Sequence, residues 1–441
     1  MRPILSAKEY ERVLWGLTQD QRQLAANAIV SAARELMTKH SLSRAVFLCG
    51  EPLREIGKLA AKELDAVTVL SYREELPDLS DALICDLLFS SSMKNNSRPL
   101  TPILSVGIPA GVDPNTGRAA DDAAHAEITV APFGYLSGLF LHDGLDHCGE
   151  IRPIGGETET AEGICRFEGE DARRLLPPRK RTAHKGDSGK ALLCAGSPKY
   201  VGAALLSARA CLAAGCGILY VACPDVVREA LWQLPEAIGI SVGEDWSKES
   251  CGAAIQSLTG IKALGLGCGV GDGDVSPLIE AALQSKLPLV LDADGLNCLS
   301  RHPELYALLH EKVILTPHPG EMSRLTGLPV REIMDDPVAV AVKYARLWGC
   351  TVLLKGAATV VSDGKQTRIV AEGNAGLGKG GSGDVLTGII TGLLTQGVDP
   401  FDAACLGSYL LGTSADKAFA LLKERMLRAT NVIEALEDRN E

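Results

Sequence analysis

The sequence has few aromatic residues, and its cysteines form no recognisable metal motif. Only 4% of the 441 residues are aromatic while 46 are glycine, a mixture that suits α/β layers because small residues let helices approach a sheet closely. The 13 cysteines stand singly, with no CxxC pair and no Cys/His cluster at metal spacing. Cys194, Cys223 and Cys350 lie in apolar runs. We expect small buried thiols in a reducing compartment, not a structural zinc site or disulfides.

Two further absences concern nucleic acids and membranes. The formal net charge of −11 leaves no basic surplus to hold a phosphate backbone, although local amides and a few lysines can still bind a small anion. The most apolar stretch, CLAAGCGILYVACP (residues 211–224), is too short to span a bilayer. The N-terminus is charged from the start and lacks an apolar signal core. We expect a cytoplasmic protein that binds neither nucleic acids nor membranes.

The length of the chain predicts two α/β domains. A helical pattern runs from residue 7 to 40, and a second helix is predicted over residues 53–64. Buried strands are predicted at residues 45–50, 66–71, 82–90, 102–111 and 126–134, at a spacing that indicates a doubly wound parallel sheet. The polar stretch GGETETAEG (residues 155–163) marks a linker, with the boundary between residues 157 and 170. The predicted domains are residues 1–160 and 168–438.

The second half also alternates strands with helices. Strands are predicted at residues 191–196, 218–224, 287–294, 312–318, 351–356 and 367–373, with a helix over residues 203–215. Several of these strands end in polar or charged residues. Because open α/β sheets bind ligands at the carboxyl ends of their strands, we expect one crevice to gather these ends.

The strongest functional signal is GNAGLGKGGSGDVLTGIITGLLTQG (residues 373–397). A glycine loop that leads into an apolar helix predicts an anion hole of backbone N–H groups, here those of Gly380, Gly381, Ser382 and Gly383. Asp384 falls in the first helical turn, where a carboxylate is suited to act as the base on a substrate hydroxyl. The alternative is that Asp384 only caps the helix, but capping needs one glycine at most.

Three other strand ends carry candidate ligand groups. Lys355 ends an apolar strand and can place a cation on a phosphate, or be an exposed lysine of a turn. His318 lies between two prolines in a rigid loop, and is either a ligand contact or a structural histidine. Asp292 and Asp294 follow another strand, where they can hold Mg²⁺ directly or through water, or cap the next helix. A glycine turn at residues 265–273 and the loop from Gly196 complete the set.

Taken together, the ordered motifs of the second half resemble the ADP/ATP-dependent NAD(P)H-hydrate dehydratases, which are ribokinase-like. These motifs are HKG, AGSPKYVGAALL, GLGCGVG, LDADGLN, LTPHPGE, LKGAATV and GLGKGGSGDVLTGII. The first half is similar to the Rossmann-like NAD(P)H-hydrate epimerase domain of the bifunctional repair enzymes, through SVGIPAGVDPNTG (residues 105–117), APFGYLSGLF and the domain order. The resemblance covers nearly all of the second half and is looser in the first.

The resemblance implies a reaction and assigns roles to residues. ADP or ATP, with Mg²⁺, would phosphorylate the ring hydroxyl of the S epimer of NADHX or NADPHX, and phosphate elimination would restore the double bond. Asp384 would be the base and the 380–383 amides would steady the phosphoryl group. The adenine-nucleotide contacts would be Lys355, Gly356, Ala357, Ala358, Thr359 and Gly383. The hydrate contacts would be Ala203, Gly271, His318 and Asp384. A homo-oligomer is expected.

The first half departs from the epimerase pattern where its function would lie. The family's Gly/Asn-rich nucleotide loop is replaced here by CGEPLREIGKLA, and the family's V-D-I-P-S-G by VGIPAG. The position where the family has an acidic residue expected to act on the hydrate is therefore occupied by Gly107, whose lack of a side chain leaves no proton to transfer. The sequence predicts that this half has lost epimerase activity and persists as a scaffold or interface.

Two rival functions stay open for the second half. A small-molecule kinase of the same fold, such as a vitamin-precursor kinase, would use the same anion hole and aspartate. A nucleotide-binding regulatory protein without turnover is the other. The TPHPGE and LDADGLN motifs favour the dehydratase, and the retention of Asp384 argues against a protein without turnover.

Overall fold

The computed structural model describes residues 2–64, 67–71, 79, 81–89, 101–155, 163–178, 182, 188–247, 249, 251, 260–422 and 424–438. The chain divides into two compact units, Met1–Arg166 (unit 1) and Phe167–Glu441 (unit 2). Most of the expected linker, residues 156–162, and the HKG motif at residues 184–186 lie outside the described residues.

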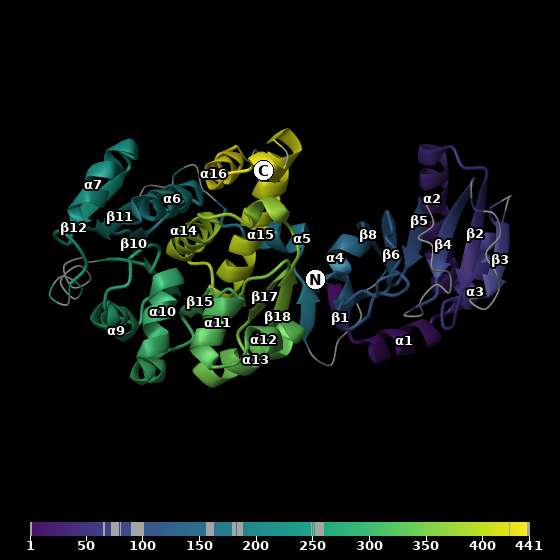
Figure 1. Cartoon of the computed structure of the whole chain (residues 1–441), viewed down its shortest axis with the longest axis horizontal. Helices are drawn as coiled ribbons and strands as arrows, with labels where there is room; N and C mark the ends of the chain where they lie inside the picture. The colour runs from purple at the N-terminus through teal and green to yellow at the C-terminus, as the bar shows by residue number, and fades with distance from the viewer. Residues whose placement is uncertain are drawn as a thin grey trace. The chain divides into compact units, whose positions relative to one another are not determined.

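Unit 1 contains a six-stranded parallel sheet in the order β3-β2-β4-β5-β6-β8. Helices α2 and α3 pack together and against this sheet (Figure 1). The elements of unit 1 are β1 (Arg2–Leu5), α1 (Ala7–Trp15), α2 (Gln19–His40), β2 (Arg44–Cys49), α3 (Arg54–Ala61), β3 (Val67–Ser71), β4 (Ala82–Leu87), β5 (Ile103–Val106), β6 (Ile128–Pro132), β7 (Tyr135–Leu136), η1 (Ser137–Leu139), α4 (Gly144–His147), β8 (Glu150–Ile154) and β9 (Ile164–Arg166). The predicted doubly wound parallel sheet is confirmed.

The helical pattern predicted over residues 7–40 is two helices, not one. Gly16 ends α1, and Thr18 is the N-cap of α2. The Thr18 hydroxyl accepts from the Gln21 N–H, and the side-chain oxygen of Gln21 accepts from the Thr18 N–H. A second capping box, Ser6 with Glu9, begins α1. Hydrophobic periodicity continues across this break, whereas the caps satisfy the backbone groups that each helix end leaves without partners.

Unit 2 carries strands in the order β12-β11-β10-β13-β14-β15-β16-β17-β18. Its elements are α5 (Gly169–Leu175), β10 (Lys190–Cys194), α6 (Val201–Ala213), β11 (Ile218–Cys223), α7 (Asp225–Ala230), η2 (Leu231–Gln233), β12 (Ala237–Ser241), β13 (Ala263–Leu266), α9 (Ser276–Gln284), β14 (Leu289–Leu291), α10 (Ala293–Arg301), η3 (Pro303–Leu308), β15 (Val313–Leu315), α11 (Pro319–Thr326), α12 (Val330–Asp335), α13 (Pro337–Trp348), β16 (Thr351–Leu354), β17 (Thr359–Ser362), β18 (Thr367–Val370), η4 (Ala375–Leu377), α14 (Ser382–Thr395), α15 (Pro400–Leu422), η5 (Glu424–Met426) and α16 (Ala429–Glu437).

The strands of unit 2 from β12 to β16 pair in parallel, and β17 and β18 continue the sheet antiparallel. Helices α6, α14 and α15 pack on the strands from one side. The helices α9, α10, α11, α12 and α13 lie on the other side (Figure 1). The strands predicted in this half are all present, whereas the sequence does not predict β12, β13 and β17, which are at most five residues long.

Two glycines inside α14 fix its position. A Cβ at Gly388 would lie 2.2 Å from the carbonyl oxygen of Ser207 in α6, and one at Gly392 would lie 2.6 Å from that of Cys211. Only glycine allows so close a helix crossing, although it weakens a helix interior. Since α14 is buried from Val385 to Thr395, this crossing holds the glycine loop that precedes it.

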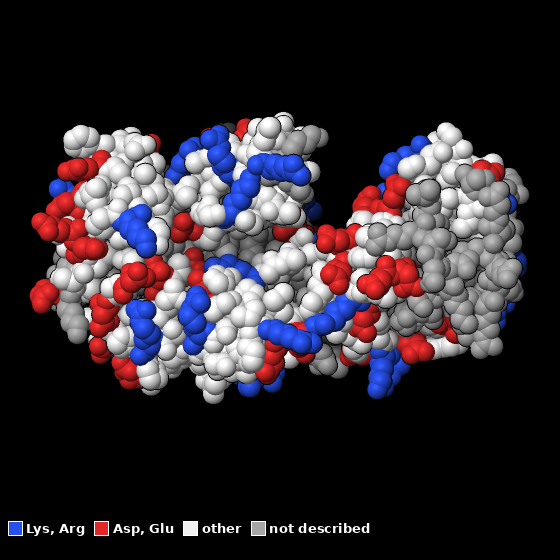
Figure 2. All heavy atoms as spheres, viewed as in Figure 1, with Lys and Arg blue, Asp and Glu red and all other residues white. Residues whose placement is uncertain are grey.

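The cores of both units consist mainly of aliphatic side chains. All 13 cysteines are free thiols, and Cys194, Cys223 and Cys350 are buried, which confirms their prediction as core residues. Across the described part of the chain, no helix is both long enough and apolar enough to cross a membrane. On the face of unit 2 that Figure 2 shows, residues of both charges are interspersed.

Candidate active site

The parallel strands of unit 2 bring distant polar residues to one edge of the sheet. Asp292 follows β14, Thr316 follows β15, and Lys355 follows β16. These strands are neighbours in the sheet, so their carboxyl ends lie together. The predicted gathering of strand ends is thus present in the structure.

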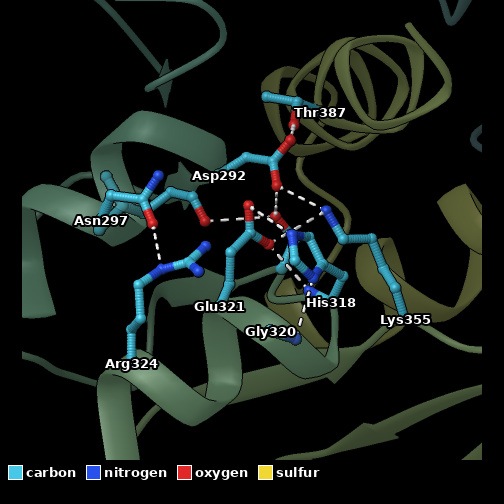
Figure 3. A network of polar contacts seen from close by, with 10 residues as sticks. Asp292, Asn297, His318, Gly320, Glu321, Arg324, Lys355 and Thr387 are labelled. Carbon is cyan, nitrogen blue, oxygen red and sulfur yellow. Dashed lines mark hydrogen bonds and ion pairs between the residues drawn. The ribbon is translucent and has the colours of Figure 1, made fainter. Parts of the chain in front are cut away.

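The carboxylate of Asp292 is the centre of this site (Figure 3). It is 1% exposed, and its Oδ1 accepts hydrogen bonds from Lys355 Nζ and Thr316 Oγ1, both at 2.8 Å. Its Oδ2 accepts from Thr387 Oγ1 at 3.1 Å. Burial favours the neutral acid, but the Lys355 ammonium and these hydrogen bonds prevail and hold the pKa of Asp292 below its ordinary value. Asp292 is therefore ionised near neutral pH.

Lys355 completes the ion pair. Its Nζ also lies 3.7 Å from Oε2 of Glu321, and its side chain is 22% exposed. Burial opposes the charge, yet the carboxylates of Asp292 and Glu321 keep the pKa of Lys355 above its ordinary value. The Lys355 ammonium is thus held between the carboxylates of Asp292 and Glu321.

Helix α14 begins directly above this ion pair. Its N-cap is Gly381, at a φ of +100°, which provides no side-chain cap for the first N–H groups. A Cβ at Gly383 would lie 3.3 Å from Asp292 Oδ2 and 3.6 Å from Lys355 Nζ, and Gly380 faces open space. An N-terminus of a 14-residue helix without a side-chain cap is suited to receive an anion.

Asp384 lies in the first turn of α14, as predicted. Burial raises its pKa to about 6, and the neighbouring Asp292 carboxylate adds to the shift while Lys355 reduces it. A carboxylate with a pKa near the working pH is well placed to accept a proton. This shift is also typical of functional sites, since a capping aspartate normally has a lowered pKa.

His318 is the N-cap of α11. Its Nδ1 accepts a hydrogen bond from the N–H of Gly320 at 3.0 Å, and Oε2 of Glu321 accepts from the His318 N–H at 2.8 Å. Because Nδ1 is an acceptor, the proton of the neutral ring is on Nε2, which lies 3.5 Å from Oε1 of Glu321. Burial lowers the pKa of His318. The half-exposed ring therefore has a structural role, and its outer edge is free to face a ligand.

The residues matched to hydrate binding come from two helices, with Ala203 in α6 and Asp384 in α14, and from the two loops of Gly271 and His318. Oδ2 of Asp294 accepts from the N–H of Gly271 at 2.9 Å, which holds the glycine turn against α10. A Cβ at Gly271 would lie 3.7 Å from Ser197 Oγ, and one at Gly269 would lie 2.8 Å from the Cβ of Ala203. Ala203 and Gly271 are thus on segments that pack together.

The residues matched to nucleotide binding form the turn between β16 and β17. Gly356 and Ala357 are exposed, Ala358 is buried, and Thr359 begins β17. The N–H of Lys355 donates to the carbonyl of Pro317 at 2.9 Å, which joins this turn to the loop of His318. On the face in Figure 2, the surface is hollowed between α14 and α11.

The sequence did not single out several residues of the site. Thr316 and Thr387 bond Asp292, and Arg324 Nε donates to Asn297 Oδ1 at 2.7 Å (Figure 3). Ser197 is 3% exposed, and its Oγ has no hydrogen-bond partner in the described part of the chain. Thr387 follows Asp384 by three residues on α14, which places both on one helix face. This spacing is the sequence signal that identifies Thr387.

A separate cavity of about 740 Å³ lies at the opposite edge of the same sheet. Pro288, Lys312 and Cys350, which precede β14, β15 and β16, line it together with residues 397–401. None of the candidate substrate, nucleotide or metal residues named above lines this cavity.

In the sheet of unit 1 the strand order reverses at β2, which lies between β3 and β4. Gly107 follows β5 at the carboxyl edge, and a Cβ there would lie 3.5 Å from Cε1 of Tyr10 and 3.6 Å from Cδ2 of Phe89. The two rings are stacked, with centroids 5.9 Å apart, and Tyr10 is 1% exposed. An acidic side chain at this position would therefore start in van der Waals contact with two aromatic rings.

Asp86, near the end of β4, lies close to this edge of unit 1. It is fully buried and accepts hydrogen bonds from the N–H groups of Leu88 and Ala110 and from Ser105 Oγ, at 2.7 to 3.1 Å. Burial raises its pKa against these bonds. Its bonds hold neighbouring loops in place, which is a structural role.

Comparison with known proteins gives consistent results. Residues 191–437 match the family model of the NAD(P)H-hydrate dehydratases. The bifunctional NAD(P)H-hydrate repair enzyme Nnr of Vibrio cholerae is 33% identical, covering 86% of this chain and 78% of its own length. The ADP/ATP-dependent NAD(P)H-hydrate dehydratase of Bacillus subtilis, co-crystallised with ATP and Mg²⁺, is 31% identical over 63% of this chain and 97% of its own, with a TM-score of 0.56. A ribokinase-like protein of Enterococcus faecalis matches in fold, at 23% identity and a TM-score of 0.55.

Proposed function

Since this chain belongs to the bifunctional NAD(P)H-hydrate repair enzymes and is an NAD(P)H-hydrate dehydratase, we propose that Asp384 and the start of α14 carry its reaction. The substrate is the S epimer of NADHX or NADPHX, with ADP or ATP as phosphoryl donor. The proposal depends mainly on one observation: an aspartate with a raised pKa lies beside a helix N-terminus that has no side-chain cap.

The first step transfers a phosphoryl group. The ring hydroxyl oxygen attacks the terminal phosphorus of the nucleotide, the bond from that phosphorus to its bridging oxygen breaks, and Asp384 takes the hydroxyl proton. The N–H groups of residues 380–383 stabilise the charge on the transferred group. The ionised pair of Asp292 and Lys355, against Gly383, fixes where that helix end lies.

The second step eliminates phosphate. The bond between the ring carbon and the phosphate oxygen breaks, the neighbouring ring carbon gives its proton to the departing phosphate, and the carbon–carbon double bond re-forms. Phosphate is a far better leaving group than hydroxide, which explains why the dehydration is coupled to a nucleotide. The exposed turn of residues 356–357 supports a position for the nucleotide beside β16.

Mg²⁺ fits this site as a companion of the nucleotide phosphates. It usually keeps several waters and takes one or two protein carboxylates. Both oxygens of Asp292 already accept hydrogen bonds, so we propose contact through water for Asp292 and for Asp294. When bound, the ion would supply charge neutralisation at the phosphates.

Unit 1 is proposed to have no epimerase activity. The observation that supports this is the pair of stacked rings, Tyr10 and Phe89, next to Gly107. Aromatic side chains supply neither a carboxylic acid nor a carboxylate base at that point of the edge.

The decisive experiment mixes NADHX with the full chain, Mg²⁺ and either ADP or ATP, and follows NADH absorbance. Nucleotide-dependent recovery of NADH supports the proposal, and the two nucleotides separately tested give the donor preference. A halt once one epimer is consumed supports the inactive first unit. Formation of a stable phosphate ester instead of NADH would mean a kinase of the same fold.

A further inference from the structure

A cluster of three different metal-binding side chains lies on unit 2 outside the site described above. Its members are Asp274, Cys298 and His302, and one potential ligand atom from each lies within 4.8 Å of the others. Cys298 lies in the last turn of α10, and His302 directly follows that helix as its C-cap residue. Asp274 comes from the loop before α9, 24 residues earlier in the sequence.

The distances within this cluster are close to those of a tetrahedral zinc site. Nε2 of His302 lies 3.3 Å from Oδ1 of Asp274, and Sγ of Cys298 lies 3.9 Å from the same oxygen. Zn²⁺ with ordinary bond lengths requires about 3.3 Å between nitrogen and oxygen ligands and about 3.5 Å between sulfur and oxygen ligands. The sulfur–oxygen distance would have to shorten by a few tenths of an ångström to reach this value.

A fourth residue orients the histidine. Nδ1 of His302 lies 2.9 Å from Oε1 of Glu304. A carboxylate that accepts from one imidazole nitrogen leaves the other nitrogen unprotonated and directed at the metal, as is usual for metal-binding histidines. This contact is independent of the three ligand atoms and points to the same use of Nε2.

The site is accessible but backed by the core. Cys298 is fully buried, whereas the side chains of His302 and Asp274 are 25% and 42% exposed. Three protein ligands with one side open to solvent leave a fourth position for water. Thiolate, imidazole and carboxylate together favour Zn²⁺ over Mg²⁺ or Ca²⁺, which prefer oxygen ligands alone.

We propose that Asp274, Cys298 and His302 bind Zn²⁺, with Glu304 as a positioning residue, and that the ion ties the 271–275 loop to α10. The same loop is already held at the start of α10, where Asp294 accepts from the N–H of Gly271. The ion would hold it at the end of that helix as well. Its effect on hydrate binding rests on the proposed function of Gly271, whereas metal binding itself does not.

The test is a titration of the full, chelator-treated chain with Co²⁺, in the absence of nucleotide. One equivalent is expected to give the visible bands of tetrahedral cobalt and a sulfur-to-cobalt charge-transfer band, both removed by one equivalent of Zn²⁺. Cys298→Ala and His302→Gln should lose the charge-transfer band. Asp274→Asn and Glu304→Gln change exposed side chains, so they should keep the fold and weaken Co²⁺ binding, by about tenfold or more for Glu304→Gln.

Cys216→Ser is the matched control. A hydrogen bond from the Cys211 thiol lowers the pKa of Cys216 to about 7, which makes it a competing thiolate. This variant should keep the one-equivalent titration unchanged. Absence of the cobalt bands in the wild-type chain, or their persistence in Cys298→Ala and His302→Gln, would overturn the proposal and leave the cluster as a hydrogen-bonded ion pair.

A separate readout connects the site to turnover. If the proposed function holds, the chelator-treated chain, assayed with Mg²⁺ restored after the chelator is removed, should show a raised KM for the hydrate with little change in kcat, and added Zn²⁺ should restore the KM. Cobalt bands with an unchanged KM would mean that the metal binds but that its hold on the loop does not affect hydrate binding. Absence of the bands in the wild-type chain would mean that there is no metal site.

Discussion

The two units build the same kind of parallel sheet but leave their carboxyl edges in opposite states. In unit 2 the edge gathers an ion pair, a carboxylate of raised pKa and an uncapped helix start. In unit 1 the edge around Gly107 is filled by two stacked aromatic rings. Layers of this architecture fold with either edge, so activity depends on a few side chains at the strand ends and not on the fold.

The comparison also shows how buried acids differ in use. Asp86 of unit 1 accepts two backbone N–H groups and a hydroxyl, as a structural acid would. Asp384 of unit 2 is buried near another carboxylate, which leaves it poised to exchange a proton. Among buried acids, the partners that surround the carboxylate distinguish a structural role from a catalytic one.

The largest expected effect is on turnover. Asp384→Asn removes the proposed base and should reduce kcat of NADH recovery by about 10²- to 10⁴-fold, the range that proton transfer contributes. Nucleotide binding, measured by titration, should be retained because the helix N–H groups are unchanged. Glu280→Gln, an exposed carboxylate on α9, is the control and should keep wild-type activity. Wild-type activity in Asp384→Asn would mean that this carboxylate is not the base, so it would not distinguish the carboxyl edge of unit 2 from that of unit 1.

The next effect is on the stability of unit 2. Lys355→Met leaves Asp292 as a buried, unpaired charge and should lower the free energy of unfolding by about 3–5 kcal/mol. Adding Asp292→Asn should recover part of this loss, because the unpaired charge is then removed. Denaturant unfolding of both variants gives the comparison.

The exposed Lys343 of α13 provides the control for this measurement. Lys343→Met should change the unfolding free energy by no more than about 0.5 kcal/mol. Equal losses for both lysine variants would mean that the ion pair contributes no more than a surface charge.

The sequence predicts more of the fold than of the contacts within the site. Strands of alternating or continuous apolar residues were predictable, because periodicity reports burial directly. The break at Gly16 was not, because the apolar periodicity continues across it although its caps are local. The short strands β12 and β13 were not, since their pairing is set by strands distant in sequence. The glycine loop that leads into α14 and the place of Asp384 in its first turn were predictable, because these residues are adjacent in the chain.

Contacts across the sheet were the part that sequence reasoning could not supply. Asp292 was considered as a metal ligand and Lys355 as a phosphate contact, each on its own strand. The structure joins them at 2.8 Å across residues 63 positions apart in the sequence. The Asp274, Cys298 and His302 cluster was missed for the same reason, because one ligand lies on a separate loop.

A smaller effect follows from the pKa of Asp384. Because the folded-state pKa of about 6 exceeds the ordinary value of 3.8, the folded state favours the protonated acid. Ionisation therefore destabilises the fold progressively as pH rises from about 4 to about 6, by about 3 kcal/mol in total. Asp384→Asn should lack this loss and be more stable than the wild type at pH 7 but not at pH 3.5. Urea unfolding across this range checks the sign, and parallel curves for the two proteins would contradict it.

The last prediction concerns the closed edge of unit 1. Gly107→Asp restores an acidic residue, but the backbone there has a φ of +83° and the new Cβ would contact the Tyr10 and Phe89 rings. The variant should lose about 1–3 kcal/mol of stability and gain no interconversion of the hydrate epimers above the uncatalysed rate.

Gly243→Asp separates the two contributions to that loss. Gly243 has a similar φ of +89°, but no atom lies within 4 Å of a Cβ added there, so its cost comes from the backbone alone. A larger loss at Gly107 then measures the crowding by the rings, and the loss that Gly107→Asp causes should be smaller in a Tyr10→Ala background than in the wild type. Equal losses at both glycines would mean that the rings yield readily. In that case the missing acid alone, and not a filled edge, would distinguish unit 1 from an epimerase.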